Sequence, residues 1–144
     1  MTNNAPDYED NLAFEPVKTA GTIEMVTKDG KAVAIRCYID SQHYFDLALE
    51  DAPEKMDWFD VKIWCEEHYC RLPMKHELEF IGKNLKAVNK ALIRAGGEPL
   101  KNDWYWSSSE YGYNWAWGAN LNNSNLGNYN KGLTGIYVLP VLAL

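Results

Sequence analysis

Side chains capable of metal or redox chemistry cluster in one part of the 144-residue chain. Cys65 and His68 are three residues apart and would share one helix face, whereas Cys70 lies off that face. Structural zinc sites usually combine two closely spaced ligand pairs, and no fourth ligand is obvious here beyond His76. These residues therefore indicate buried thiols and a hydrogen-bonded histidine rather than a metal site.

Nucleophilic chemistry has one candidate, the run Ser107-Ser108-Ser109-Glu110. The three histidines, His43, His68 and His76, stand in no catalytic motif, and no phosphate loop or nucleophile elbow is present. Hydroxyls at a strand end commonly bond the nearby backbone. The acidic residues between Glu50 and Asp60 fit a solvated surface as well as a hard-cation site. We therefore expect no enzyme, no metal and no cofactor.

Aromatic rings and amides dominate a C-terminal segment that is almost free of charge. Residues 111–144 carry one formal charge, Lys131, and seven asparagines fall between Asn114 and Asn130. Exposed rings beside amides suit a protein or sugar partner, because rings supply contact area at little entropic cost. A twisted sheet with Asn-rich turns is the alternative interpretation. Trp104, Trp106 and Trp117 alternate with smaller or polar residues and are expected to pack inward.

Periodicity and turn signals predict the elements that would position these groups. We expect a hairpin about Asp29-Gly30, then two helical regions, then a meander, which together make an α+β domain over residues 21–144. Residues 1–20 lack periodicity and are predicted to be an N-terminal arm. The expected strands are Thr22–Thr27, Lys31–Ile39, Trp104–Ser107, Trp115–Leu121, Leu126–Asn130 and Ile136–Leu142. The expected helices run from a cap at Asp57 to about His68, and from about Lys75, with a fresh start at Asn84, to Gly96-Gly97.

Charge and composition exclude several classes of protein. With 20 acidic and 14 basic residues the formal net charge is −6, which argues against nucleic-acid binding. No apolar run is long enough to cross a membrane. The three cysteines, Cys37, Cys65 and Cys70, cannot all pair, and residues 1–11 do not resemble a signal peptide. We expect synthesis in the cytoplasm and a cytoplasmic or virion-associated protein.

A set of short motifs, taken in order, resembles one family. The motifs are Trp58-(x)6-Cys65, Cys70-Arg71-Leu72-Pro73 followed by Glu77-Leu78, Trp104-Tyr105-Trp106-Ser107-Ser108-Ser109-Glu110, Ala116-Trp117, and Tyr137-Val138-Leu139-Pro140-Val141. Over residues 20–144 they resemble the C-type-lectin-like domains of gut-bacterial and phage proteins, including the variable proteins of diversity-generating retroelements and phage receptor-binding proteins. The segment Phe45–Pro53 resembles the stretch that leads into the first helix of phage-borne members.

The resemblance implies a C-type-lectin-like fold, in which two helices pack on small twisted antiparallel sheets and a ligand face lies near the C-terminus. The implied function is non-enzymatic recognition of a protein or glycan, for example on a bacterial surface. The alternative is a structural head or tail-fibre component that contacts virion subunits through the N-terminal arm or through the same face. The implied ligand residues are Tyr111, Tyr113, Asn114, Trp115, Gly118, Asn120, Asn122, Asn123, Asn125, Asn128, Asn130 and Leu133.

The chain departs from the family pattern at several positions. Cys70 stands where glycine is usual, and Met74 stands where a helix-capping threonine is usual. Leu139 and Leu142 replace arginines of the usual closing pattern. The calcium-binding triplets of sugar-binding animal lectins are not matched by the segments 98–100 and 102–104, so we expect calcium-independent binding.

Overall fold

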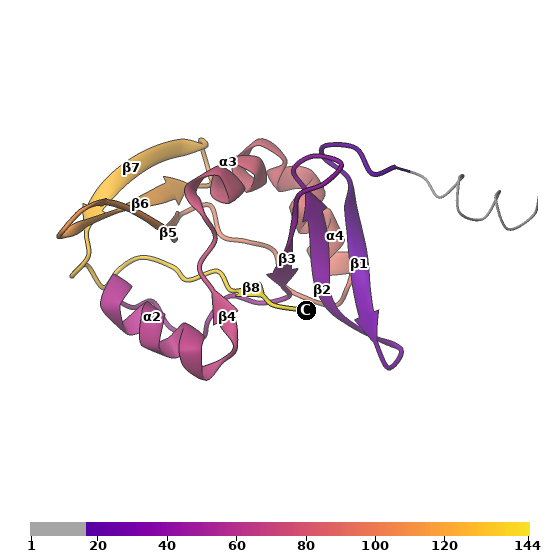
Figure 1. Cartoon of the computed structure of the whole chain (residues 1–144), viewed down its shortest axis with the longest axis horizontal. Helices are drawn as coiled ribbons and strands as arrows, with labels where there is room; N and C mark the ends of the chain where they lie inside the picture. The colour runs from indigo at the N-terminus through magenta and orange to yellow at the C-terminus, as the bar shows by residue number, and fades with distance from the viewer. Residues whose placement is uncertain (1–16) are drawn as a thin grey trace, which may run out of the picture.

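Three helices and two antiparallel sheets form the part of the chain that the computed structural model describes, residues 17–144 (Figure 1). The strands are β1 (Ile23–Lys28), β2 (Lys31–Tyr38), β3 (Tyr44–Ala48), β4 (Cys70–Arg71), β5 (Trp104–Gly112), β6 (Trp115–Asn120), β7 (Asn125–Asn130) and β8 (Val141–Leu142). One sheet has the order β1-β2-β3-β8-β4 and the other β5-β6-β7, so the predicted α+β class is confirmed. The first sixteen residues of the predicted arm lie outside the described residues.

The N-terminal hairpin forms as its turn signal predicts. Asp29 and Gly30 adopt φ angles of 52° and 78°, the left-handed region that a two-residue hairpin turn requires. On β2, the side chains of Ile35 and Cys37 are fully buried. The sequence patterns did not predict β3, which pairs with β2 on one side and β8 on the other.

Three helices form, because the second of the two expected helical regions starts afresh at Asn84, as the sequence predicts. α2 (Trp58–Glu67) begins at Asp57, whose carboxylate accepts the Asp60 N–H at 2.8 Å. The second helical region is divided at Asn84 into α3 (Lys75–Lys83) and α4 (Leu85–Arg94). Asn84 leaves helical geometry at φ −119°, and its side-chain amide donates to the Phe80 carbonyl at 2.8 Å. This local bond competes with the helix ladder and makes the break complete.

The N-terminus of α3 is capped without a side chain from Met74, as the sequence predicts. Glu77 reaches back instead, and its Oε1 accepts the Met74 N–H at 2.7 Å. The same carboxylate receives two bonds from the Arg71 guanidinium, at 2.7 and 2.9 Å. Glu77 is 3% exposed whereas the Arg71 side chain is 43% exposed, so this partly buried pair ties β4 to α3.

The expected strand Ile136–Leu142 is wrong over most of its length. Only Val141 and Leu142 are in a strand, between β3 and β4. Upstream, Tyr137 forms an isolated parallel bridge to Tyr105, exchanging backbone bonds with Trp104 and Trp106. The proline before β8 lacks the N–H that a continuous ladder needs.

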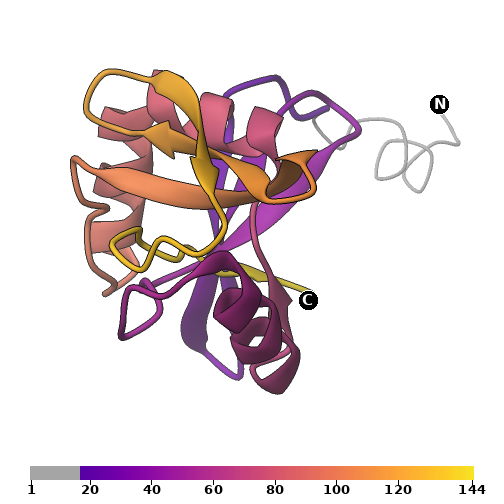
Figure 2. The ribbon, with the colours of Figure 1, turned by 90° about the vertical axis from the view of Figure 1, so that its left-hand side faces the viewer.

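The three-stranded sheet lies between two apolar clusters, in front of the rest of the molecule in Figure 2. On one of its faces Tyr105 and Ala119 join the larger core, which includes residues of α3 and α4. On the other face Trp106 and Ala116 pack with Trp58 of α2 and its neighbours. Packing on both faces holds the sheet rigidly and leaves its outer end free to meet a partner.

Candidate recognition surface

One face of the outer β5–β7 end carries the exposed rings of Tyr111 and Trp115. In the β6–β7 register, Trp115 is opposite Asn130 and Trp117 is opposite Asn128. Directly opposite residues of an antiparallel pair project from the same face, so these four side chains lie together. Tyr111 joins them, because its ring meets that of Trp117 edge to face with centroids 5.3 Å apart. We call Tyr111, Trp115, Trp117, Asn128 and Asn130 the aromatic face.

A cation from α3 reaches the same face. The Lys75 ammonium lies 4.0 Å from the centre of the Trp117 ring. Its backbone N–H donates to the Ser109 hydroxyl at 3.0 Å, which fixes the start of α3 against β5. The Ser107 hydroxyl in turn accepts the Ser109 N–H at 3.1 Å. The hydroxyls of Ser107 and Ser109 therefore bond the backbone, as expected, but the run lies within β5 and not at a strand end, because β5 continues to Gly112 beyond the expected end at Ser107.

Lys131 fixes the turn beside the aromatic face. Its ammonium is 2.6 Å from Glu110 Oε1 and donates to the Tyr113 carbonyl at 2.8 Å. Its side chain is only 4% exposed, and the ammonium lies 4.4 Å from the centre of the Trp58 ring. The hydrogen bond and charge of Lys131 lower the pKa of the Glu110 carboxyl. The one charge of the C-terminal segment is thus internal, and it holds the Tyr113-Asn114 turn.

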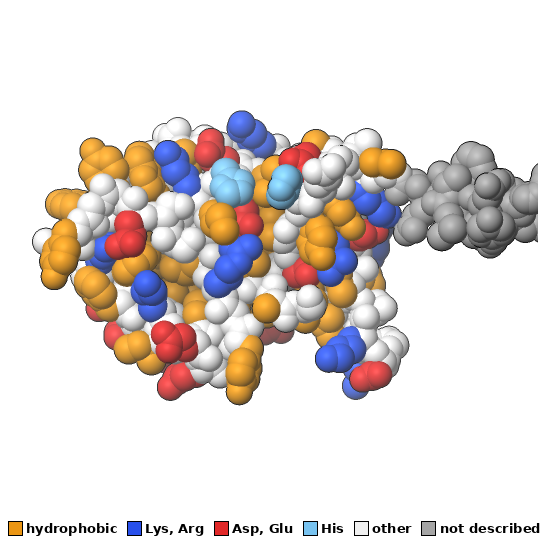
Figure 3. Space-filling view, viewed as in Figure 1, with side chains coloured by type: hydrophobic (Ala, Val, Ile, Leu, Met, Phe, Trp, Pro, Cys, Tyr) orange, Lys and Arg blue, Asp and Glu red, His pale blue; other side chains and the backbone are white. Residues whose placement is uncertain are grey.

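The rim of this end is formed by three predicted ligand residues. Tyr113 is 92% exposed, Leu133 is 44% exposed, and the Asn114 carbonyl accepts the Lys131 N–H at 2.9 Å. Over this end of the molecule, Figure 3 shows hydrophobic and uncharged side chains with single charged ones among them. A partner approaching here would meet rings and amides, with the exposed Glu110 carboxylate and the Lys75 ammonium beside them.

The remaining asparagines lie at the opposite end of the sheet. Asn122 and Asn123 form the turn between β6 and β7, and β6 separates them from the Tyr113 turn by about 17 Å. Asn120 and Asn123 use their side-chain carbonyls to accept N–H groups of the turn, at 2.9 and 3.0 Å. The predicted ligand residues therefore form two separate groups, of which Asn120, Asn122, Asn123 and Asn125 are the second.

Gly118 is buried and belongs to neither group. A Cβ at Gly118 would lie 3.0 Å from the Tyr105 carbonyl oxygen, and one at Gly127 would lie 3.2 Å from the Trp104 ring. The two glycines make a flat strip under the Trp104 indole, which meets the Tyr129 ring edge to face at 4.8 Å. The role of Gly118 is close packing within the sheet.

Sequence reasoning did not assign Trp117 and Lys75 to this surface. Trp117 was expected in the core, yet it is half-buried on the same face as Trp115. The two-residue spacing of these tryptophans, within a predicted strand, was a signal for a shared face. Lys75 precedes them by forty residues, and nothing in the sequence links the two positions.

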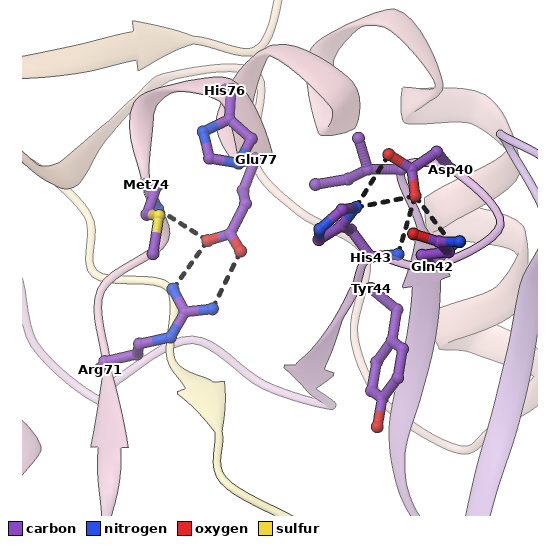
Figure 4. A pocket seen from close by; sticks show the side chains of 9 residues that line it. Asp40, Gln42, His43, Tyr44, Arg71, Met74, His76 and Glu77 are labelled. Atoms are coloured by element: carbon purple, nitrogen blue, oxygen red, sulfur yellow. Dashed lines mark hydrogen bonds and ion pairs between the residues drawn. The ribbon is translucent and has the colours of Figure 1, made fainter.

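A second concave site lies away from the aromatic face. A pocket of about 610 Å³ separates the Asp40–Tyr44 loop from the start of α3 (Figure 4). His43 lies on one wall, with its Nδ1 2.9 Å from Asp40 Oδ1, and His76 lies on the other. The Arg71–Glu77 pair forms the inner wall, so its charges are already matched.

Cys37 and Cys65 are buried, and Cys70 is half-buried. Burial raises the pKa of Cys37 and of Cys65 to about 12, and it also raises the pKa of Cys70. A high thiol pKa leaves little thiolate at neutral pH. Within residues 17–144, no three His, Cys, Asp or Glu side chains gather as a metal site would require. None of the helices in this range has the length and apolarity needed to span a membrane.

Comparisons with protein-family models, with curated proteins and with solved structures gave no match to this chain. The grounds for a function are therefore the residues of the aromatic face and their geometry.

Proposed function

We propose that the protein is a non-enzymatic recognition domain with a C-type-lectin-like fold, and that the aromatic face binds a protein or glycan ligand. Diversity-generating-retroelement variable proteins and phage receptor-binding proteins are the implied relatives. The observation that carries the proposal is a cluster of rings on a rigid sheet end, in which Tyr111 and Trp115 are exposed and Trp117 is half-buried.

Two features of the architecture support the fold. A strand near the C-terminus, β8, completes the sheet begun by the N-terminal hairpin, and all helices lie between them in sequence. A separate meander, β5 to β7, carries the exposed rings. A C-type-lectin-like domain would likewise combine helices, a closing strand and a distinct ligand-bearing region.

Binding would follow the physics of other ring-based recognition surfaces. The rings are already ordered by Lys75 and by one another, so a ligand would freeze few rotamers on contact. Asn128 offers both a donor and an acceptor beside them, which suits sugar hydroxyls or a peptide backbone. The Asn-rich β6–β7 turn would serve as a second, separate contact for a ligand long enough to reach it.

The test is to screen the full chain on an array of bacterial surface glycans and on purified bacterial surface proteins. For a binder found there, Trp117→Ala is expected to weaken binding about 30-fold, as a central aromatic anchor does. Phe59→Ala is the matched control, because Phe59 is 51% exposed but lies on α2. Equal binding by wild type and Trp117→Ala, with loss in Phe59→Ala, would assign recognition to α2 and refute the proposal.

A further inference from the structure

The free edges of the two sheets differ in how well they are protected against pairing with another strand. On β1 the ladder is interrupted by a bulge between Val26 and Thr27, and the strand carries Glu24 and Lys28. β4 is only two residues long. The outer side of β5 is covered where Tyr137 exchanges backbone bonds with Trp104 and Trp106. Bulges, charges, short strands and covering segments are the devices by which proteins prevent edge-to-edge association.

β7 has none of these devices and lies at the outer edge of its sheet (Figure 1). All six of its residues, Asn125–Asn130, pair with β6 in unbroken register, and none is charged or proline. Within the described chain, the backbone of residues 126–129 has no hydrogen bond beyond the ladder to β6. Alternate residues therefore direct unpaired N–H and C=O groups outward.

We propose that β7 pairs antiparallel with β7 of a second copy of this chain, across a twofold axis at Asn128. Two residues that lie opposite each other in an antiparallel pair have their side chains on the same face of the sheet. A twofold axis perpendicular to the sheet satisfies this condition only if it passes through a residue position, and not between two neighbouring residues. Centring it on Asn128 pairs all residues from Leu126 to Asn130. The two Asn128 amides then meet at the axis, and each Gly127 lies opposite Tyr129 of the other copy.

A second copy fits this edge better than a charged partner would. The chain carries a net charge of −6, yet the edge itself is neutral, so two copies can approach here without placing like charges in contact. The pairing would join the two meanders into one six-stranded sheet.

The consequence for recognition is bivalency. Asn128 and Asn130 belong to the aromatic face, and the twofold keeps equivalent faces on the same side of the joined sheet. Two aromatic faces would then lie side by side, and a repetitive ligand could engage both. One strand pair buries less than the roughly 1,200 Å² of a stable interface, so the dimer should be transient.

The experiment is sedimentation analysis of the full chain from about 10 µM to about 1 mM, the range for a weak interface. The wild type is expected to shift from monomer to dimer. Asn128→Lys should raise the dissociation constant at least about fivefold, because two ammonium groups would face each other at the axis. Asn122→Lys, an exposed change in the β6–β7 turn, is the matched control and should associate like the wild type.

A mixture of Asn128→Lys and Asn128→Asp chains tests the register. Each variant alone should be weakened, whereas the mixture should associate again, because opposite charges would then meet at the axis. A wild type that stays monomeric, an Asn128→Lys chain that dimerises normally, or a mixture that fails to recover would each overturn the proposal. None of these readouts involves a ligand, so they are independent of the test of the aromatic face.

Discussion

Lys131 is the position at which a single substitution should most clearly reveal how the recognition end is held. Lys131→Met keeps the apolar stem but removes the ammonium, and with it the bonds to Glu110 and to the Tyr113 carbonyl. It also removes the cation from the Trp58 ring, 4.4 Å away. The carbonyl of the Tyr113 turn then loses its partner.

The loss of stability expected for Lys131→Met follows from the burial of the Lys131 ammonium. A hydrogen bond from a charged donor contributes about 1.5–3 kcal/mol, and a largely desolvated cation–π contact contributes about 1–2 kcal/mol. Part of this sum is offset, because the variant no longer has to desolvate a charge. We expect a net loss of about 2 kcal/mol in the free energy of unfolding, which lowers Tm by about 7 °C for a domain of this size.

Chemical denaturation at pH 7 measures this loss, with Lys62→Met as the control. Lys62 also lies over the Trp58 ring, at 4.7 Å, but it is solvent-exposed, so its loss should change stability by less than about 0.5 kcal/mol. Equal effects of the two substitutions would refute the reasoning that burial gives Lys131 its contribution.

The same variant has a predicted pH dependence. Lys131 lowers the pKa of folded Glu110 below its usual value of 4.5, so the ionised carboxylate is the form that favours folding. This contribution is present above pH 4.5 and is lost as the pH falls through the folded-state pKa. The stability difference between wild type and Lys131→Met should therefore narrow in acid.

Two further predictions concern the scaffold. Gly97→Ala should destabilise the fold by about 3 kcal/mol in denaturant melts, because the alanine Cβ would lie 2.3 Å from the Leu49 carbonyl oxygen. The control Gly135→Ala should have little effect, because the space around Gly135 is open. Burial raises the pKa of Asp51, although Tyr105 donates to it at 2.8 Å, so the protonated acid is the form that favours folding. Thermal melts across a range of pH should show that wild type loses stability relative to Asp51→Asn as the pH rises from below 3.8 through the raised folded-state pKa of Asp51. Parallel stability curves for the two proteins would contradict this.

Local signals in the sequence were sufficient to predict the hairpin, the helix cap and the presence of the strands of the meander. Asp29-Gly30 requires a tight turn through its backbone preference alone, and Asp57 caps α2 through a bond three residues away. The aromatic and asparagine content also identified the segment that carries the exposed rings of Tyr111, Tyr113 and Trp115. Such features depend on neighbours in the chain, and for that reason sequence patterns predict them.

The long-range choices were not readable from the chain. β3 pairs with β2 in a register that places Arg36 opposite Asp46, 2.7 Å apart. The 136–140 segment bridges to β5 at Tyr137 instead of joining a ladder. The fresh start at Asn84, by contrast, was predicted from the sequence, because it depends on a local bond from the Asn84 side chain to the Phe80 carbonyl.

The composition of the C-terminal segment, rich in rings and amides and poor in charge, was determined by the sequence alone. The separation of its predicted ligand residues into two groups was decided by the tertiary structure. The pleat of β6 brings Trp117 to the surface beside Trp115 and turns Gly118 inward, and its length separates the Asn122 turn from the aromatic face. Lys131, the one charge in that segment, is internal because the Trp58 ring and the Tyr113 carbonyl converge on it from elements distant in sequence. Composition is a property of the chain, but which side chains share a face depends on register and packing between distant segments.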